Sequence, residues 1–144
     1  MLTLDRTAYL EILAEAWRVY PLEACGLLVG PAGTGMASTF YPVPNAAQSS
    51  RVFTLDSLGY MKAERVADEA GLEVIGILHS HTHTSAYPSP TDVAEATKPL
   101  VPPTWRWAIV SLAWGYPELR SFVIGAPTDS SPTGIAEEPV VLSD

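Results

Sequence analysis

The sequence predicts an α/β (α+β) sandwich, in which helices flank a mixed, mostly antiparallel central sheet. Three observations predict this fold. Stretches with apolar residues three and four apart, which is helical spacing, alternate with short apolar runs of strand length. Turns rich in glycine and proline separate these segments. The 144 residues contain no repeat and no linker, so we expect a single domain over residues 1–144.

Periodicity and turn residues place the individual elements. Asp5 and Asp56 are the expected N-caps of the first two helices, which end near Pro21 and Gly71. The first helix is expected to bury an apolar stripe made of Tyr9, Leu13, Ala16 and Tyr20, flanked by Leu10 and Trp17. The expected helices cover residues 5–20, 56–71 and 89–98, and the expected strands cover 25–30, 36–43, 52–55, 73–79, 105–112, 118–124 and 134–142.

The composition excludes several functions. A net charge of −8 without a basic cluster argues against nucleic-acid binding. No apolar run approaches the length of a membrane span, and the first residues lack a secretory signal, so we expect a cytoplasmic protein that does not contact the membrane. The single cysteine, Cys25, excludes an internal disulfide and a cysteine-rich zinc finger. It stands in an apolar run, which favours core packing.

Two histidines stand two residues apart at the end of the apolar run 74–78. In an extended strand the side chains of His79 and His81 point to the same face. Asp92 adds a carboxylate from a second element, after a connecting loop. Two histidines and one carboxylate form a catalytic zinc set that leaves one coordination position for water. We therefore predict an enzyme in which His79, His81 and Asp92 bind one Zn²⁺ per chain.

The segment from Ser89 to Asp92 and the nearby His83 each have an alternative interpretation. Ser89, Pro90 and Asp92 also fit the N-cap, N1 and N3 positions of a capping box, and the two roles of Asp92 are compatible. His83 continues the spacing from His81 and is a possible third nitrogen ligand. Because three histidines and Asp92 would leave no position for water, we expect His83 to lie outside the coordination sphere.

An upstream Glu23-Ala24-Cys25-Gly26, then His-x-His, seven residues and Ser-x-x-Asp, resembles the JAMM (MPN-plus) zinc metalloprotease family. The His-Ser-His-Thr segment and Ala-Tyr-Pro-Ser-Pro-Thr-Asp-Val are especially similar to a small bacterial branch acting on ubiquitin-like sulfur-carrier proteins. The resemblance implies an MPN/JAMM-like, cytidine-deaminase-like core. It also implies that Glu23 moves the proton from water to the leaving amine, and that Ser89 donates a hydrogen bond to the oxyanion.

The function implied by this resemblance is that of a zinc-dependent metallopeptidase or isopeptidase. Its substrate would be the C-terminal tail of a ubiquitin-like or sulfur-carrier protein, for example one carrying cysteine or an extension after Gly-Gly. The protein would be a monomer or a homodimer. A cell-wall or phage-tail peptide hydrolase of the same family and a catalytically silent MPN interaction scaffold remain alternatives. Barrel phosphoesterases with an H-x-H motif are excluded, because their fold needs roughly 200 residues or more.

Overall fold

The computed structural model describes residues 1–144, and its central feature is a six-stranded sheet. The strand order is β4-β2-β5-β6-β7-β8, and only β5 and β6 run parallel to each other. The strands are β2 (Cys25–Gly30), β4 (Thr39–Val43), β5 (Glu73–His81), β6 (Arg106–Trp114), β7 (Tyr116–Ile124) and β8 (Ile135–Glu138). The predicted mixed, mostly antiparallel sheet is therefore confirmed.

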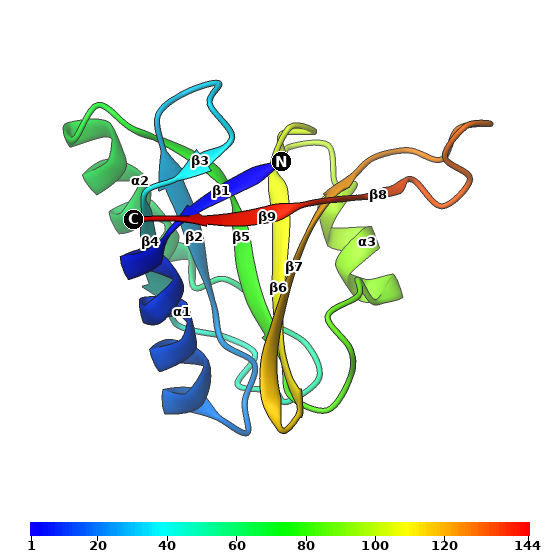
Figure 1. Cartoon of the computed structure of the whole chain (residues 1–144), viewed down its shortest axis with the longest axis horizontal. Coiled ribbons are helices and arrows are strands. Elements are labelled where there is room, and N and C mark those ends of the chain that lie inside the picture. The colour runs from blue at the N-terminus through cyan, green and yellow to red at the C-terminus, as the bar shows by residue number, and fades with distance from the viewer.

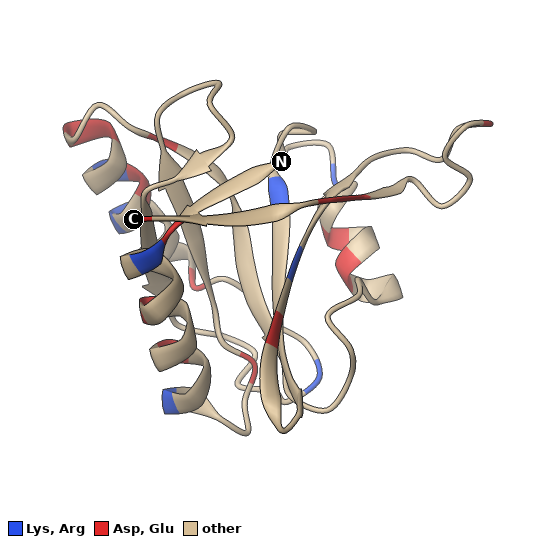
Figure 2. Cartoon of the chain, viewed as in Figure 1, with Lys and Arg blue, Asp and Glu red and all other residues tan.

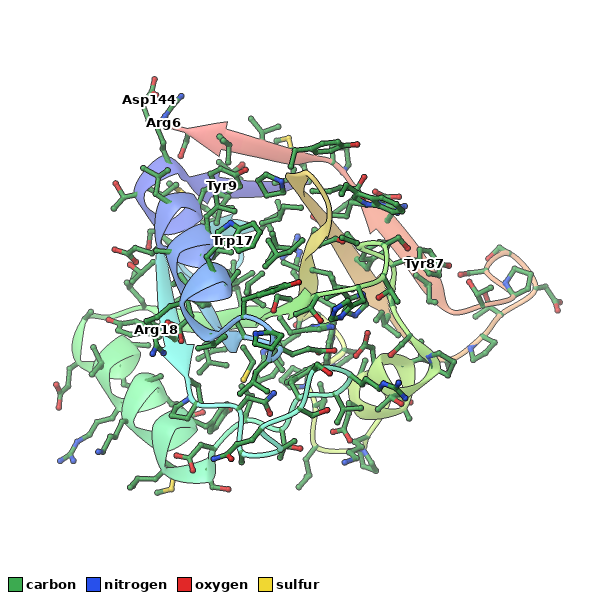
Figure 3. The ribbon with its side chains drawn as sticks, turned by 90° about the horizontal axis from the view of Figure 1, so that it is seen from below. Arg6, Tyr9, Trp17, Arg18, Tyr87 and Asp144 are labelled. Atoms are coloured by element: carbon green, nitrogen blue, oxygen red, sulfur yellow. The ribbon has the colours of Figure 1, made fainter.

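Helices cover both faces of this sheet (Figure 1). Helix α1 (Arg6–Val19) lies on one face, whereas α2 (Ser57–Glu69) and α3 (Pro90–Ala96) lie on the other, as the view along the sheet shows (Figure 3). Each face buries its own apolar cluster: Leu78 of β5 packs beneath α1, and its neighbour Ile77 packs toward α2. Because both faces are buried, the central strands read as continuous apolar runs rather than as alternating ones.

A second, smaller sheet crosses in front of the first in Figure 1, and the sequence does not predict it. It consists of β3 (Met36–Ala37), β1 (Leu2–Asp5) and β9 (Val140–Ser143), with β1 parallel to both of its neighbours. The expected strands 36–43 and 134–142 are therefore each divided between the two sheets. Such short segments depend on partners far away in the sequence, and local patterns do not contain that information.

Two further expectations are corrected. The expected strand 52–55 is reduced to one bridge between Asn45 and Leu55 within a long connection. Helix α1 does begin after its N-cap Asp5, but its buried residues are Ala8, Ile12 and Ala16. Of the expected stripe, only Ala16 is buried, Tyr9 and Leu13 are half-buried, and Leu10, Trp17 and Tyr20 are exposed. Packing against the two sheets thus rotates the buried face of the helix away from the one expected.

None of the helices combines the length and the apolar character needed to cross a membrane. Basic residues are few and scattered over separate elements (Figure 2). Helix α2 begins after Asp56, whose Oδ2 accepts a hydrogen bond from the Gly59 N–H at 2.8 Å. This helix leads directly into β5, the strand that carries the two histidines.

We expect Ile12→Ala to lower the free energy of unfolding by about 2–5 kcal/mol, because the Ile12 side chain lies on the buried face of α1 and is 0% exposed. The matched change on the same helix is Leu10→Ala, at a residue that is 58% exposed, and it should cost less than about 0.5 kcal/mol. Urea unfolding of the two variants measures both values. Equal losses would contradict the helix orientation described above.

Candidate active site and metal-binding cluster

The two histidines lie at the C-terminal end of β5, at the lower end of the large sheet in Figure 1. The strand continues to His81, two residues beyond its expected end, so the backbone is still extended where the histidines stand. Both rings therefore lie on the face that carries α2 and α3. His79 is 0% exposed and His81 is 5% exposed, so both rings are almost completely buried.

Three donor atoms converge beside the end of β5. The Nε2 atoms of His79 and His81 are 3.1 Å apart. The Oδ2 atom of Asp92, in the first turn of α3, lies 3.2 Å from the His79 nitrogen and 3.1 Å from the His81 nitrogen. The structure thus brings together the three residues that the sequence predicts as metal ligands, in a triangle of nearly equal sides.

This triangle fits a small metal ion. In a tetrahedral zinc site with bonds of about 2.0–2.1 Å, neighbouring donor atoms are about 3.3–3.4 Å apart. The observed separations of 3.1–3.2 Å need to widen only slightly to reach that geometry. The donor types, two imidazole nitrogens and one carboxylate oxygen, are those of catalytic zinc sites, and three protein donors leave one position open.

Neighbouring groups orient each donor. The Nδ1 of His81 lies 2.7 Å from the Ser85 carbonyl oxygen, to which its N–H donates, so Nε2 is the ring atom that would face a cation. The ring of His79 stacks on Phe53, with centroids 4.4 Å apart and an interplanar angle of 23°. The Ser89 N–H donates to Asp92 Oδ2 at 2.9 Å, and the Asp92 N–H donates to Ser89 Oγ at 3.1 Å. The expected capping box is therefore present together with the donor cluster.

Burial and the hydrogen bonds within the cluster shift the pKa of each donor residue. Burial lowers the pKa of His79, which keeps the ring neutral. Burial alone would raise the pKa of Asp92, but hydrogen bonds from both histidines hold it well below its usual range. Burial alone would also lower the pKa of His81, but the hydrogen bond to Asp92 and the Ser85 carbonyl raise it. Metal binding requires an ionised carboxylate and two neutral imidazoles, so a bound cation would have to displace the proton that His81 shares with Asp92.

Ser80, between the two histidines, fixes Glu23 beside them. Its side chain points to the opposite face of β5, where its Oγ accepts a hydrogen bond from the Ala24 N–H at 2.7 Å. The Ser80 N–H in turn donates to the Ala24 carbonyl oxygen at 2.9 Å. In the same register Cys25 stands opposite His79. Glu23, two residues before Cys25, therefore reaches the face on which the histidines lie.

The Glu23 carboxylate is buried without a partner. One of its oxygens lies within 4.8 Å of a nitrogen of each histidine, and the side chain is 4% exposed. Its Oε1 atom makes no hydrogen bond. Burial raises the pKa of this carboxyl to about 7, with His81 lowering it and Asp92 raising it by smaller amounts. A carboxylate with a pKa near neutrality can both accept and release a proton at physiological pH.

The other candidate residues lie around this centre. Ser89 is half-buried at the start of α3, and its Oγ–H remains free to donate while the oxygen accepts from Asp92. His83 is exposed in the following loop, with its Nδ1 2.7 Å from Thr82 Oγ1, and it is not part of the donor triangle. Cys25 is buried, and its thiol donates to the Val43 carbonyl oxygen at 3.3 Å. Burial raises the pKa of this thiol to about 12, which keeps it protonated.

Three residues of the site have no role in the sequence interpretation: Ser80, Phe53 and Asn45. Asn45 organises the connection between β4 and α2, because its side-chain amide donates to the Glu23 and Val52 carbonyl oxygens at 3.0 and 3.1 Å. Its Oδ1 accepts from the Thr54 N–H at 3.0 Å. The only local sign that Ser80 has a structural role is that it is a polar residue inside an apolar strand. Nothing local identifies Phe53, because its contact with His79 is made by the folded connection.

The fold and this cluster define a class of protein, a hydrolase whose buried donor set can hold a metal ion, and comparison with known proteins agrees. A family model described as prokaryotic homologs of the JAB domain matches residues 5–130. The chain is 38% identical over 130 residues to a CysO-cysteine peptidase of Mycobacterium tuberculosis, covering 88% of this chain and 86% of that protein. It is 30% identical over 115 residues to a probable TtuB-protein conjugate cleaving protease of Thermus thermophilus, covering 79% and 70%.

Solved structures agree as well. The solution structure of a protein from Desulfitobacterium hafniense superposes with a TM-score of 0.84 at 31% identity, covering all of this chain and 94% of the other. The chain therefore belongs to the prokaryotic JAB family, and it is a hydrolase that acts on peptide bonds.

The metal-free protein should lose stability as the pH rises through the range in which Glu23 titrates. The pKa of Glu23 is about 7 when folded and about 4.5 when unfolded, so the folded state binds more protons between these values and its stability falls with rising pH. Replacing Glu23 by glutamine removes this titration. In chelator-treated protein, we therefore expect Glu23→Gln to raise the melting temperature more at pH 8 than at pH 5.

The matched control for this measurement is Glu11→Gln, at an exposed carboxylate of α1. Thermal unfolding of this variant should differ from the wild type by a similar small amount at both pH values. A Glu23→Gln effect that is equally independent of pH would show that the carboxylate is not buried in the way described.

Proposed function

We propose that this protein is a zinc-dependent metallopeptidase that cleaves the bond after the C-terminal tail of a ubiquitin-like or sulfur-carrier protein. The observation that carries the proposal is the buried, unpartnered Glu23 carboxylate within 4.8 Å of the histidine nitrogens. A carboxylate in that position has little structural value, because it is desolvated without a compensating hydrogen bond. It is well placed to move a proton at a reacting centre beside the cluster.

The proposed ligands of one zinc ion per chain are His79, His81 and Asp92. Zinc bound there supplies Lewis acidity toward the scissile carbonyl and the attacking water. Glu23 accepts the proton of that water through a carboxylate oxygen and then delivers it to the nitrogen of the leaving amine. The pKa of Glu23, near 7 in the metal-free protein, suits both steps, because the carboxyl must gain and lose a proton in each cycle.

Ser89 is proposed to act on the carbonyl oxygen. Its Oγ accepts a hydrogen bond from the Asp92 N–H, and its own proton is free to be donated to a substrate. The scissile carbonyl oxygen becomes negatively charged as the carbon becomes tetrahedral, and a hydrogen bond from Ser89 strengthens at that moment. The donor cluster and the proposed oxyanion contact thus share one helix terminus.

Two hollows beside the site suggest where the two parts of a substrate lie. A polar cavity of about 510 Å³ contains Glu23, His81 and Ser89 and has no hydrophobic residue in its lining. The lining of a mostly apolar groove of about 580 Å³ includes Trp107 and Phe53, the residue that stacks on His79. Because Glu23 protonates the leaving amine, we assign the leaving group to the polar cavity. The carrier tail then approaches from the side of Phe53.

The test uses candidate ubiquitin-like carrier proteins that bear one cysteine after a C-terminal Gly-Gly. Incubation with the zinc-loaded protein should remove that cysteine, which intact-mass spectrometry detects directly. A chelator should stop the reaction, and added zinc should restore it. If no such carrier loses its extension under conditions in which zinc is bound stoichiometrically, the proposed function is wrong.

Two isosteric variants separate the proposed roles of the acidic residues. Glu23→Gln should keep stoichiometric zinc and lose at least about 100-fold in kcat, because proton transfer fails while the donor triangle is intact. Asp92→Asn should lose zinc affinity as well as activity. Metal analysis after dialysis measures the first property and the mass assay the second. Loss of zinc in Glu23→Gln would identify Glu23 as a ligand rather than as the proton carrier.

A further inference from the structure

Arg51 differs from most of the other basic residues of the chain. Six of the eight lysine and arginine side chains are paired with a carboxylate, as Arg6 is with Asp144 at the edge of the molecule (Figure 3). The two without such a partner are Arg51 and Lys62. In a chain with a net charge of −8, an unpaired guanidinium is available for an anion from outside.

Hydrogen bonds hold the backbone around Arg51 at two points beside the site. The preceding residue, Ser50, accepts a hydrogen bond through its carbonyl oxygen from Thr82 Oγ1 at 3.2 Å, just beyond His81. Ser49 accepts through its carbonyl oxygen from the Glu23 N–H at 2.8 Å. The Ser49 hydroxyl also accepts from the Arg51 N–H at 3.0 Å. The backbone that carries Arg51 is thus tied both to the proposed proton carrier and to the end of β5.

Arg51 lines the polar cavity that contains Glu23 and Ser89, and it is the only lysine or arginine there. The rest of the lining is made of hydroxyl-bearing residues, two histidines and the Glu23 carboxylate. A volume of about 510 Å³ accommodates a single amino acid with water around it. The cavity therefore combines a proton donor for an amine with a positive charge for an anion.

We propose that Arg51 binds the free α-carboxylate of a single leaving amino acid and thereby makes the enzyme selective for one residue at the C-terminus of the carrier. This proposal rests on the proposed function. In such a leaving group the carboxyl carbon is only two bonds, about 2.5 Å, from the nitrogen that Glu23 protonates. One cavity that contains both Glu23 and Arg51 can therefore bind both ends of the amino acid at once.

The same chemistry selects against an isopeptide-linked lysine. In that substrate the leaving nitrogen is a side-chain amine, and the α-carboxylate lies several bonds further away in an amide bond. No anion then reaches Arg51, and the charge-assisted hydrogen bonds that the free carboxylate would accept from the guanidinium are not made. The structure thus favours removal of a single amino acid over cleavage of a protein–protein conjugate.

The experiment compares two forms of one substrate, a ubiquitin-like carrier ending in Gly-Gly-Cys either as the free acid or as the C-terminal carboxamide. The two differ only in the charge that Arg51 would bind, and the thiol is common to both. For the zinc-loaded wild type, kcat/KM for the acid should exceed that for the carboxamide by about 10- to 100-fold. In Arg51→Gln this ratio should fall to near 1, mainly through a lower kcat/KM for the acid.

Lys62→Gln is the matched control, because Lys62 is the other unpaired cation and lines a different hollow, beside α2. This variant should keep the wild-type ratio. A second measurement does not depend on turnover: metal-free wild type should bind the acid more tightly than the carboxamide in fluorescence anisotropy, and Arg51→Gln should bind both equally.

The proposed function and the proposed role of Arg51 fail in different ways. If the wild type cleaves neither form, the proposed function is wrong, and the role of Arg51 with it. If the wild type cleaves both forms equally, or if Arg51→Gln slows both to the same extent, the proposed function stands and carboxylate recognition by Arg51 is overturned.

Discussion

The site depends on the pair of hydrogen bonds that joins Ala24 to Ser80. Ser80 faces away from the histidines, yet its backbone N–H and its hydroxyl both bind Ala24 and so fix the register of β2 on β5. A slip of one residue would turn Glu23 to the opposite face of the sheet, because side chains alternate along a strand. The proximity of Glu23 to His79 and His81 is therefore a property of strand pairing rather than of any contact that Glu23 makes itself.

Around this register, each donor is held by a different part of the chain. The loop after β5 orients His81 through the Ser85 carbonyl, the capping box of α3 orients Asp92, and Phe53 covers His79. Two buried polar atoms of the site make no hydrogen bond, Glu23 Oε1 and His79 Nδ1. Donors held by hydrogen bonds and packing, next to an unpaired carboxylate, form a preorganised centre in which binding a cation requires little movement and the carboxylate is free to act on a proton.

Local patterns were sufficient for much of the fold and for bringing the three donor residues together. Strand β2 matches its expected range because an apolar run bounded by turn residues has few other options, and the spacing of His79 and His81 already placed both rings on one face. Local patterns did not predict the small sheet, the break between β8 and β9 at Pro139, or the buried face of α1. These features depend on packing between segments that are distant in the sequence. The roles of Ser80, Asn45 and Phe53 could not be predicted for the same reason. Their contacts form only when β2, β5 and the β4–α2 connection are adjacent in the folded protein.

The central claim is that strand register places an unbound carboxylate beside a three-donor zinc site. The most direct measurement is anomalous diffraction from crystals of the zinc-loaded protein, recorded on both sides of the zinc absorption edge. We predict one peak per chain, about 2.0–2.1 Å from His79 Nε2, His81 Nε2 and Asp92 Oδ2, with both oxygens of Glu23 outside bonding distance. A peak bonded to Glu23, or a peak away from β5, would contradict it.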